Sequence, residues 1–472
     1  MDFSVAVDEL RAGEPVAFPS DANTLQFASA LDAQDPINLR DQFILPTRAS
    51  LKKKALNGTI PAVSNSPSSD DDTACIYFVG NSLGAQPKAI RKCLDAQLET
   101  WASIGVNGHF SDMEDSPLTS WQDMAEDCAK KSADIVGANP SEIVIMNTLT
   151  INLHLMMASF YKPEGKRNKI ILEWKPYTIE SQIRWHGLDP AETMVQIQPN
   201  EDYYISTEEI LATIDKHADE TALLLLPGIQ FYSGQLFDMK RITAHAKAKG
   251  IVVGWDLAHA AGNVELYLHD WNVDFACWCT YKYINAGPGS IAGAFVHEKH
   301  GKVDFSAGTQ TWQFRDRLAG WYGHDKRTRF NMDNKFQPTV GAGGYQVSNP
   351  SAIDLASLTG ALSVFAQTKM KTLRSKALLL TAYAEHLLNK ILVDKPGAFR
   401  IITPKNPLER GTQLSVLLKE GLLDDVSRDL EAAGVICDKR KPGVIRVAPV
   451  PLYCTFTDVW KFMDVLRNTL TN

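Results

Sequence analysis

The sequence predicts an α/β protein with a large domain built on a mostly parallel sheet and a smaller α+β domain after it. Between residues 143 and 297, short apolar runs alternate with amphipathic helical stretches and are joined by short connections. This alternation is typical of a parallel sheet with helices on both faces. From about Ser351 a long helical region precedes separate strand candidates, which indicates the second domain. A chain of 472 residues is long enough for two or three packed lobes.

The composition excludes several classes of protein. A net charge of −7 does not favour a nucleic acid or an anionic membrane as partner, and 44% hydrophobic residues is ordinary for a globular chain. The N-terminus lacks the basic and apolar segments of a signal peptide, and no apolar run approaches the length of a membrane span. The seven cysteines form no CxxC pair, which favours reduced thiols. We therefore expect a cytoplasmic protein.

The chain divides into three parts. Residues 1–75 are expected to form an N-terminal arm with a helix near 21–31, and its segment 57–73 is rich in Ser, Pro and Asp. Such a composition predicts a mobile loop that carries no functional site. Residues 76–350 form the expected large domain. Residues 351–472 form the expected small domain, against which the arm should pack.

The elements of the large domain follow from periodicity. Its expected strands are apolar runs, at residues 76–79, 143–146, 170–173, 222–226, 251–255, 273–279 and 291–297. Its expected helices lie at residues 89–102, 117–136, 206–217 and 239–249. Gly137 and Gly250 stand where two of these helices should end. Ser206 and Glu209 have the spacing of a capping box.

The small domain has a different pattern. A helical region is expected over about residues 352–392, followed by strands at 399–402, 413–418, 435–438 and 444–447. Residues 302–318, of mixed composition, are expected to form a loop in the large domain.

Two residues mark the expected functional site. Asp256 ends the strand at 251–255, and Lys282 follows the strand at 273–279. Open α/β sheets bind ligands just beyond the carboxyl ends of their strands. Pyridoxal phosphate chemistry requires such a pair, because a lysine amine holds the aldehyde as a Schiff base and a carboxylate keeps the pyridine nitrogen protonated. From spacing alone, a helix-capping Asp and a solvated Lys remain an open alternative.

The amino-acid sequence around Asp256 and Lys282 is more specific than the spacing of these two residues. It reads Asp-Leu-Ala-His-Ala-Ala-Gly-Asn-Val-Glu-Leu-Tyr-Leu-His-Asp-Trp from Asp256 and Asp-Phe-Ala-Cys-Trp-Cys-Thr-Tyr-Lys-Tyr from Asp274. Both segments closely resemble the kynureninases, which are aminotransferase-like, pyridoxal phosphate-dependent enzymes of fold type I. The resemblance extends from about Arg40 to about Phe462. It implies pyridoxal 5'-phosphate as the cofactor.

The resemblance also assigns roles near the cofactor. Lys282 would hold the cofactor, exchange it for the substrate and then act as a base, which requires a neutral amine with a lowered pKa. Asp256 would stabilise the protonated ring, and His259 would support the phosphate or Asp256. Tyr281 would donate a hydrogen bond to the phosphate and is a candidate proton donor.

The cofactor phosphate is expected at a strand-to-helix turn. The strand at 143–146 leads into Asn-Thr-Leu-Thr, after which helical periodicity resumes up to Phe160. A helix N-terminus offers free backbone N–H groups and a positive dipole end to a phosphate. By pattern alone, a plain N-cap explains the turn equally well. The resemblance assigns Leu149 and Thr150 to the phosphate.

Five further residues are assigned by the resemblance alone. Ser82, in Phe-Val-Gly-Asn-Ser-Leu-Gly, would lie near the substrate, and His109 would contact its aryl end. Arg446, in Gly-Val-Ile-Arg-Val-Ala-Pro, would bind the substrate carboxylate, which a guanidinium fork suits. Trp321 and Asn349 would contact the cofactor, Trp321 across a dimer interface. Read without the resemblance, they are ordinary turn, loop, core and strand residues.

The implied activity is hydrolytic Cβ–Cγ cleavage of L-kynurenine and 3-hydroxy-L-kynurenine. The products would be anthranilate or 3-hydroxyanthranilate and L-alanine, in tryptophan catabolism and NAD biosynthesis. The resemblance implies a homodimer with small-molecule substrates. No pattern indicates a metal site, because the acidic run Asp70–Asp72 lies in the expected mobile loop.

The sequence departs from the family at residues 173–181. Kynureninases usually carry an Ala-Phe-Pro-Ser-Asp segment here, whose Phe stacks on the pyridine ring and whose Asp contacts the cofactor. In this chain Glu-Trp-Lys-Pro-Tyr, which begins at Glu173, leads straight into Thr-Ile-Glu-Ser-Gln, so several residues of the family segment are missing. Trp174 or Tyr177 offers a substitute ring for stacking. A catalytically impaired, cofactor-binding relative is therefore one alternative. Another fold type I lyase or a cysteine desulfurase is a second alternative. A desulfurase needs a reactive loop cysteine, and no cysteine of this sequence lies in an obvious mobile loop near the expected site.

Overall fold

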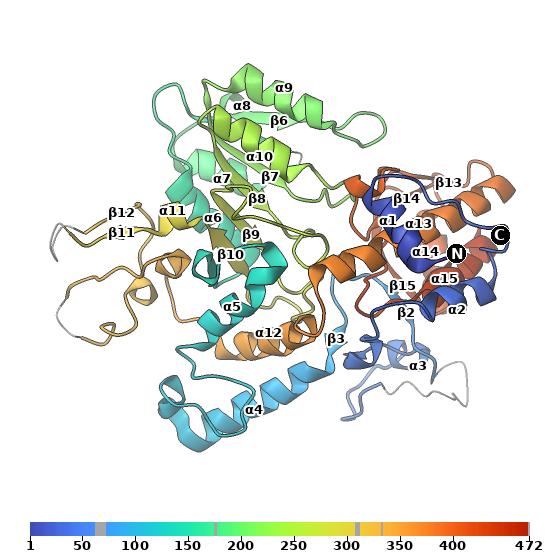
Figure 1. The fold of residues 1–472 in the computed structure, drawn as a ribbon, viewed down its shortest axis with the longest axis horizontal. Coiled ribbons are helices and arrows are strands. Elements are labelled where there is room, and N and C mark those ends of the chain that lie inside the picture. Colours follow the sequence, from blue (N-terminus) through green and yellow to red (C-terminus); the bar gives the residue numbers. More distant parts are fainter. Residues whose placement is uncertain (62–71, 174–176, 307–311, 332–333, 471–472) are drawn as a thin grey trace.

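The computed structural model describes residues 1–61, 72–173, 177–306, 312–331 and 334–470 (Figure 1). A seven-stranded sheet forms the centre of the large domain, in the order β4-β10-β9-β8-β7-β5-β6, and only β10 runs antiparallel to its neighbours. The strands are β4 (Ile143–Ile145), β5 (Lys169–Glu173), β6 (Met194–Ile197), β7 (Thr221–Pro227), β8 (Val252–Asp256), β9 (Phe275–Trp278) and β10 (Gly293–Val296). The mostly parallel α/β sheet is thus confirmed, while β6 has no counterpart among the expected strands.

Helices cover both faces of this sheet (Figure 1). The helices of the large domain include α4 (Lys88–Ile104), α5 (Met124–Val136), α6 (Leu149–Phe160), α7 (Tyr177–Trp185), α8 (Pro190–Thr193), α9 (Thr207–His217), α10 (Met239–Ala248) and α11 (Glu298–Gly301). Of these, α5, α6, α8 and α10 contact strands of the sheet. The expected caps are present: Gly137 ends α5 in the left-handed conformation, and Ser206 accepts a hydrogen bond from Glu209 N. Helix α5 begins seven residues later than position 117, because a run of turns precedes it.

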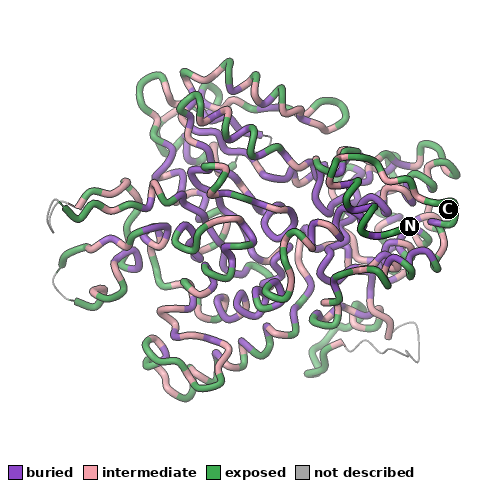
Figure 2. The backbone as a smooth tube through the Cα atoms, in the orientation of Figure 1, coloured by how far each residue is buried: buried purple, intermediate pink, exposed green. Residues whose placement is uncertain are grey.

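Successive strand residues face opposite sides of the sheet, so each side has its own core. On one side Ile170 and Leu172 of β5 belong to the same apolar cluster as Met156 of α6. On the other side Ile171 belongs to a second cluster with Ile242 of α10. Figure 2 shows the central strands buried almost throughout. The second cluster continues into the small domain.

The small domain contains a five-stranded sheet in the order β13-β14-β16-β15-β2. Its strands are β13 (Phe399–Ile401), β14 (Leu414–Leu418), β15 (Val435–Arg440), β16 (Val444–Val447) and β2 (Ile76–Phe78). The helices α13 (Met370–Asp394), α14 (Leu423–Ala432) and α15 (Phe456–Thr469) complete this domain. The four expected C-terminal strands are all present.

Strand β2 departs from the expected organisation. We expected residues 76–79 to open the large domain, but Ile76 pairs with Val435 of β15 in the small-domain sheet. An apolar run predicts that a strand forms, but it does not identify the sheet that the strand joins. The large-domain sheet therefore starts with β4.

The helical region expected over 352–392 is two helices. Helix α12 (Ala352–Phe365) ends before α13 begins at Met370. It packs on α4 and α5, so it belongs to the large domain rather than to the small domain. Gly360 permits this packing, because a Cβ there would lie 2.7 Å from the Cα of Ile90 in α4.

The N-terminal arm packs on the small domain. Helix α1 (Phe3–Arg11) contacts α13, and α2 (Leu25–Asp32) contacts α15. A buried ion pair of 2.6 Å joins Asp35 to Lys376 of α13. Residues 62–71 of the expected mobile loop lie outside the described residues.

The remaining elements are short. They are α3 (Arg48–Leu51), the pair β1 (Phe43–Ile44) and β3 (Gln86–Pro87), the hairpin β11 (Val303–Asp304) and β12 (Gln313–Phe314), and the 3-10 turns η1 (Arg40–Gln42), η3 (Gly105–His109), η4 (Pro140–Glu142), η5 (Trp321–Gly323), η6 (Ala342–Tyr345) and η7 (Pro407–Glu409). The hairpin lies within residues 302–318, which we expected to be a loop. No helix in the described part of the chain has the length and apolar character needed to cross a membrane.

Candidate active site

Asp256 and Lys282 meet at one cavity. Asp256 ends β8, which runs parallel to β9, and Lys282 follows β9. The cavity has a volume of about 310 Å³ and lies at the carboxyl ends of the strands. Its lining residues are Leu149, Leu153, Glu173, Thr178, Ile179, Leu225, Leu226, Pro227, Ile229, Phe231, Asp256, Ala258, His259 and Lys282. Three residues singled out from the sequence, Asp256, His259 and Lys282, thus share one site with Leu149.

Lys282 lies in an environment that favours its neutral form. Its Nζ is 2.9 Å from Nε2 of His259. Burial lowers the pKa of Lys282, and the positive charges of Arg446 and Arg440 lower it further. The pKa of His259 is well below its usual range, mainly through burial and then through Lys282, so the imidazole is neutral. The two side chains therefore share a hydrogen bond without charge repulsion.

Asp256 is held as a cofactor partner would require. Its Oδ1 accepts a hydrogen bond of 2.9 Å from Ala258 N, which fixes the carboxylate. Burial raises the pKa of Asp256, while this hydrogen bond and Lys282 act in the opposite direction. A protonated pyridine nitrogen would keep this buried carboxyl ionised. The carboxylate thus fits the ring of pyridoxal phosphate.

Two further observations fit a bound cofactor. Nδ1 of His259 is buried and has no hydrogen-bond partner among the described residues, a state that usually marks a missing ligand or water. At the start of α6, Thr148 makes no side-chain cap, so the first-turn N–H groups remain free for an anion. Leu149 at that turn lines the cavity, whereas Thr150 is exposed.

Tyr281 lies against the same strand end. Its ring is 5.8 Å from Lys282 Nζ, and its hydroxyl interacts with the Cys279 thiol. Burial, followed by Cys279, raises the pKa of Tyr281 to about 12. The phenol therefore stays protonated and able to donate a hydrogen bond.

The turn that carries Ser82 closes against the lysine backbone. Gly84 N donates a hydrogen bond of 2.9 Å to Tyr281 O, and a Cβ at Gly84 would lie 2.3 Å from Lys282 O. Only glycine permits this approach. Ser82 is half-buried in this turn, which links the small-domain strand β2 to the site.

Arg446 is buried at the centre of β16. Its Nη1 donates a hydrogen bond of 2.9 Å to Phe231 O, and its Nη2 pairs with Asp438. Phe231 also lines the cavity, and the charge of Arg446 lowers the pKa of both Lys282 and His259. The guanidinium is therefore bonded to a residue of the cavity wall, and its charge reaches the lysine.

Seven of the eleven expected site residues do not line this cavity: Thr150, Tyr281, Ser82 and Arg446, described above, and His109, Trp321 and Asn349. His109 ends η3, with its ring 4.9 Å from Trp121. Trp321 is 51% exposed, and Asn349 is also exposed. Within one chain His109, Trp321 and Asn349 lie apart from Lys282.

Sequence reasoning missed Glu173 and Gln230. Glu173 ends β5 and lines the cavity, where Gln230 Nε2 donates to its Oε1 at 3.0 Å. The glutamine is fixed in turn, because its Oε1 accepts hydrogen bonds from the backbone of Tyr232 and Ser233. A carboxylate at a strand end was the available signal for Glu173. Tyr177 is 78% exposed, so it does not replace the stacking ring, and Trp174 lies outside the described residues.

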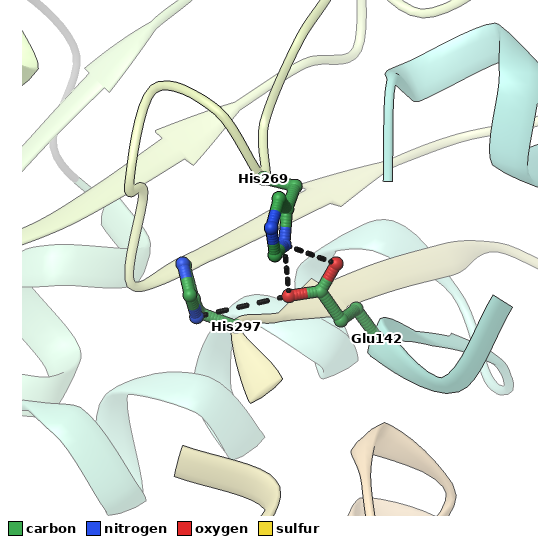
Figure 3. Close-up of side chains that lie close together, drawn as sticks. All are labelled: Glu142, His269 and His297. Carbon is green, nitrogen blue, oxygen red and sulfur yellow. Dashed lines mark hydrogen bonds and ion pairs between the residues drawn. The ribbon is translucent and has the colours of Figure 1, made fainter. Parts of the chain in front are cut away.

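A second cluster of titratable groups lies at the far edge of the sheet. His269 Nδ1 lies 2.9 Å and His297 Nδ1 lies 3.7 Å from Oε1 of Glu142 (Figure 3). Distances alone would permit a metal ion. However, the carboxylate already accepts hydrogen bonds from Asn139 N and Glu298 N, and Lys299 N donates to His297. These bonds make the cluster a set of caps for η4 and α11.

Comparisons with known proteins agree with this geometry. A model of the class-V aminotransferase family matches residues 84–332, and a model of the kynureninase C-terminal domain matches residues 373–466. Kynureninase 1 of Neurospora crassa is 67% identical over 480 residues, covering 99% of each chain. A kynureninase of Pyricularia oryzae is 62% identical and covers 97% of each chain.

Solved structures support the fold. The apo form of a cysteine desulfurase from Thermococcus onnurineus NA1 has a TM-score of 0.66 at 16% identity, covering 84% of this chain and 95% of that chain. A cysteine desulfurase from Escherichia coli has a TM-score of 0.64 at 15% identity, covering 84% and 94%. At these identities the likeness extends to the fold alone.

The fold and the lysine-bearing cavity define a class-V, aminotransferase-like enzyme that depends on pyridoxal phosphate. Within that class, the chain belongs to the kynureninase family.

Proposed function

We propose that this protein is a hydrolase of carbon–carbon bonds that cleaves L-kynurenine and 3-hydroxy-L-kynurenine at Cβ–Cγ. The products are anthranilate or 3-hydroxyanthranilate and L-alanine, within tryptophan catabolism and NAD biosynthesis. The observation that carries the proposal is the cavity in which Lys282, His259 and Asp256 meet. Relatives named kynureninase at 56–67% identity support the substrate class.

The site residues divide the work. Bound pyridoxal phosphate supplies the electron sink at Cα. Lys282, whose pKa is lowered by burial and by the nearby arginines, would remove the Cα proton, and Asp256 would hold the pyridine nitrogen protonated. Tyr281, protonated at neutral pH, would donate a hydrogen bond to the phosphate and would supply the proton that Cβ takes up when water adds at Cγ and the Cβ–Cγ bond breaks. Leu149 and Thr150 offer their backbone N–H groups to the phosphate.

Substrate recognition rests on residues from both domains. Arg446 binds the amino-acid carboxylate with its remaining N–H groups, and Ser82 contacts the substrate from the turn beside Lys282. We place the aryl end of the substrate against His109, which lies apart from Lys282 within one chain and would be brought to the site by a second copy of the chain.

A homodimer completes the site. Exposed rings of Phe110, Phe330 and Trp321 form one patch, with ring centroids 5.6 Å apart for Phe110–Phe330 and 5.8 Å apart for Trp321–Phe330. Exposed apolar patches of this kind mark interaction surfaces. A second copy of the chain would cover the patch and bring Trp321 and Asn349 to the cofactor of its neighbour. We place this dimer in the cytoplasm.

The desulfurase alternative is disfavoured by the thiols. Burial raises the pKa of all seven cysteines, which are Cys75, Cys93, Cys128, Cys277, Cys279, Cys437 and Cys454. A reactive thiol needs a lowered pKa and exposure, so none of these cysteines is prepared for sulfur transfer.

The shortened segment favours the impaired relative as a second candidate. The assay that separates the two uses purified, cofactor-loaded protein with L-kynurenine and with 3-hydroxy-L-kynurenine, and follows the aromatic product and L-alanine in equal amounts. Turnover supports the proposed function. Protein that binds cofactor without turnover, and gains turnover when Phe-Pro-Ser-Asp is inserted before Tyr177, identifies the impaired relative.

A further inference from the structure

We propose that Asp438 is a positioning residue that sets the orientation of the Arg446 guanidinium for the substrate carboxylate. This inference rests on the proposed function and extends it to a residue that does not itself touch the substrate.

Asp438 and Arg446 are direct neighbours across two strands. Asp438 of β15 pairs in register with Arg446 of the antiparallel β16. Facing side chains on one side of such a pair lie close enough to interact. Both are almost fully buried, with side-chain exposures of 6% and 1%, and their contact is a short one between Oδ2 and Nη2. The ion pair is therefore screened little by solvent.

The carboxylate is itself held from two sides. Its Oδ2 contacts Arg446, and its Oδ1 accepts a hydrogen bond of 2.6 Å from Nη1 of Arg440, which lies on the same strand. Arg440 thus compensates the buried negative charge, and the group of three side chains carries one net positive charge. A second carboxylate, from a ligand, can approach Arg446 without meeting an uncompensated anion.

The other side of the guanidinium is held by the large domain. Phe231 O accepts from Arg446 Nη1 at 2.9 Å and from Gln413 Nε2 at 3.0 Å. Between Asp438 and Phe231 the guanidinium plane is fixed, because two of its five N–H bonds have set directions. Its Nε is buried and has no hydrogen-bond partner among the described residues. Together with the second N–H of Nη1 and of Nη2, this donor remains for the oxygens of a ligand.

The test is the Asp438→Asn variant of the cofactor-loaded enzyme. Asparagine keeps the shape and one acceptor oxygen, but it removes the charge that holds Nη2. We expect the KM for L-kynurenine to rise by about 10-fold to 100-fold, the range for losing a hydrogen bond to a charged group, with kcat changed by less than about threefold.

A comparison of ligands separates positioning from a general structural effect. Kynuramine has the same aryl ketone and amine but no carboxylate, so its inhibition constant should be the same in Asp438→Asn as in the parent enzyme. Lys439→Gln is the matched control, because Lys439 lies between the two charged residues on β15 and pairs only with the exposed Asp424. Its KM should equal that of the parent.

Each outcome decides the inference. An unchanged KM in Asp438→Asn, or an equal weakening of kynurenine and kynuramine, overturns it. If the Asn variant does not fold, Asp438→Glu keeps the charge but displaces it by one methylene, and a KM equal to that of the parent again overturns the inference. Failure of the parent enzyme to turn over kynurenine refutes the proposed function instead.

Discussion

At the scale of single residues, the surroundings of Lys282 favour the neutral form of its amine. Lys282 contacts the neutral His259 at 2.9 Å and lies within the field of two buried or half-buried arginines, Arg446 and Arg440. Burial alone would lower its pKa, and the cations act in the same direction. Arg446, which we propose to bind the substrate carboxylate, therefore also favours the neutral, nucleophilic form of the amine.

The first prediction concerns Lys282→Ala. The variant should show no mass increase on the peptide around position 282 after borohydride treatment, whereas the parent gains one reduced cofactor. Turnover should fall by at least about 10³-fold, because a nucleophile and a general base are both lost. Lys302→Ala, at an exposed lysine, is the control and should match the parent. A cofactor adduct that persists in Lys282→Ala would contradict the assignment.

At the scale of elements, buried charges organise the ends of strands and helices. Glu142 is fully buried and joins η4, the N-terminus of α11 and the loop that carries His269 (Figure 3). Its hydrogen bond is the largest cause of a raised pKa at His269. His297, which stacks on His269, has a pKa lowered by burial and so remains neutral. The imidazolium of His269 is thus the group that neutralises this carboxylate.

The second prediction is a pH-dependent stability. Because the pKa of His269 is raised in the folded state, its stabilising contribution is complete below about pH 6.5, the ordinary histidine pKa, and is lost as the pH rises through the raised value. The thermal midpoint of His269→Gln should therefore lie below that of the parent at about pH 6 and approach it at about pH 8.5. His245→Gln, at a half-buried histidine outside the cluster that contacts Asp215, is the control. A constant difference between parent and His269→Gln across this range would contradict the explanation.

At the scale of the whole molecule, the two domains are joined directly at the site. The turn at Phe231–Ser233 of the large domain meets the small domain through Arg446, Ser415 and Thr403, which bond to its backbone carbonyls. The cavity wall and Arg446 therefore share one hydrogen-bond network. Movement of the small domain would alter both.

The third prediction concerns assembly. If the patch of Phe110, Trp321 and Phe330 is covered by a second copy, Phe330→Asp should shift the protein from dimer to monomer in sedimentation velocity, because a buried unpaired charge is costly. Activity should fall with dissociation and recover at high protein concentration. Trp185→Asp, at a residue 85% exposed on α7, is the control and should remain dimeric. A parent protein that sediments as a monomer would refute the dimer.

The parts of this structure that depend on local sequence patterns could be predicted from the sequence. Alternating apolar runs were sufficient to predict a mostly parallel sheet and the strands that precede Asp256 and Lys282, and the site was predicted there because ligands bind at the carboxyl ends of such strands. Pairing between distant segments left no such pattern. The partnership of Asp438 with Arg446 depends on the register of β15 and β16, and that of Gln230 with Glu173 joins different strand ends. The place of β2 in the small-domain sheet was missed for the same reason.

The position of β2 affects how the protein is made. The turn in which Gly84 contacts the backbone of Lys282 follows strand β2. The strand that pairs with β2, β15, is translated more than three hundred and fifty residues later. Nearly the whole polypeptide must therefore be synthesised before β2 can pair with β15 and hold this turn against Lys282. A chain truncated before β15 would contain Lys282 but would lack the strand that holds the Gly84 turn against it.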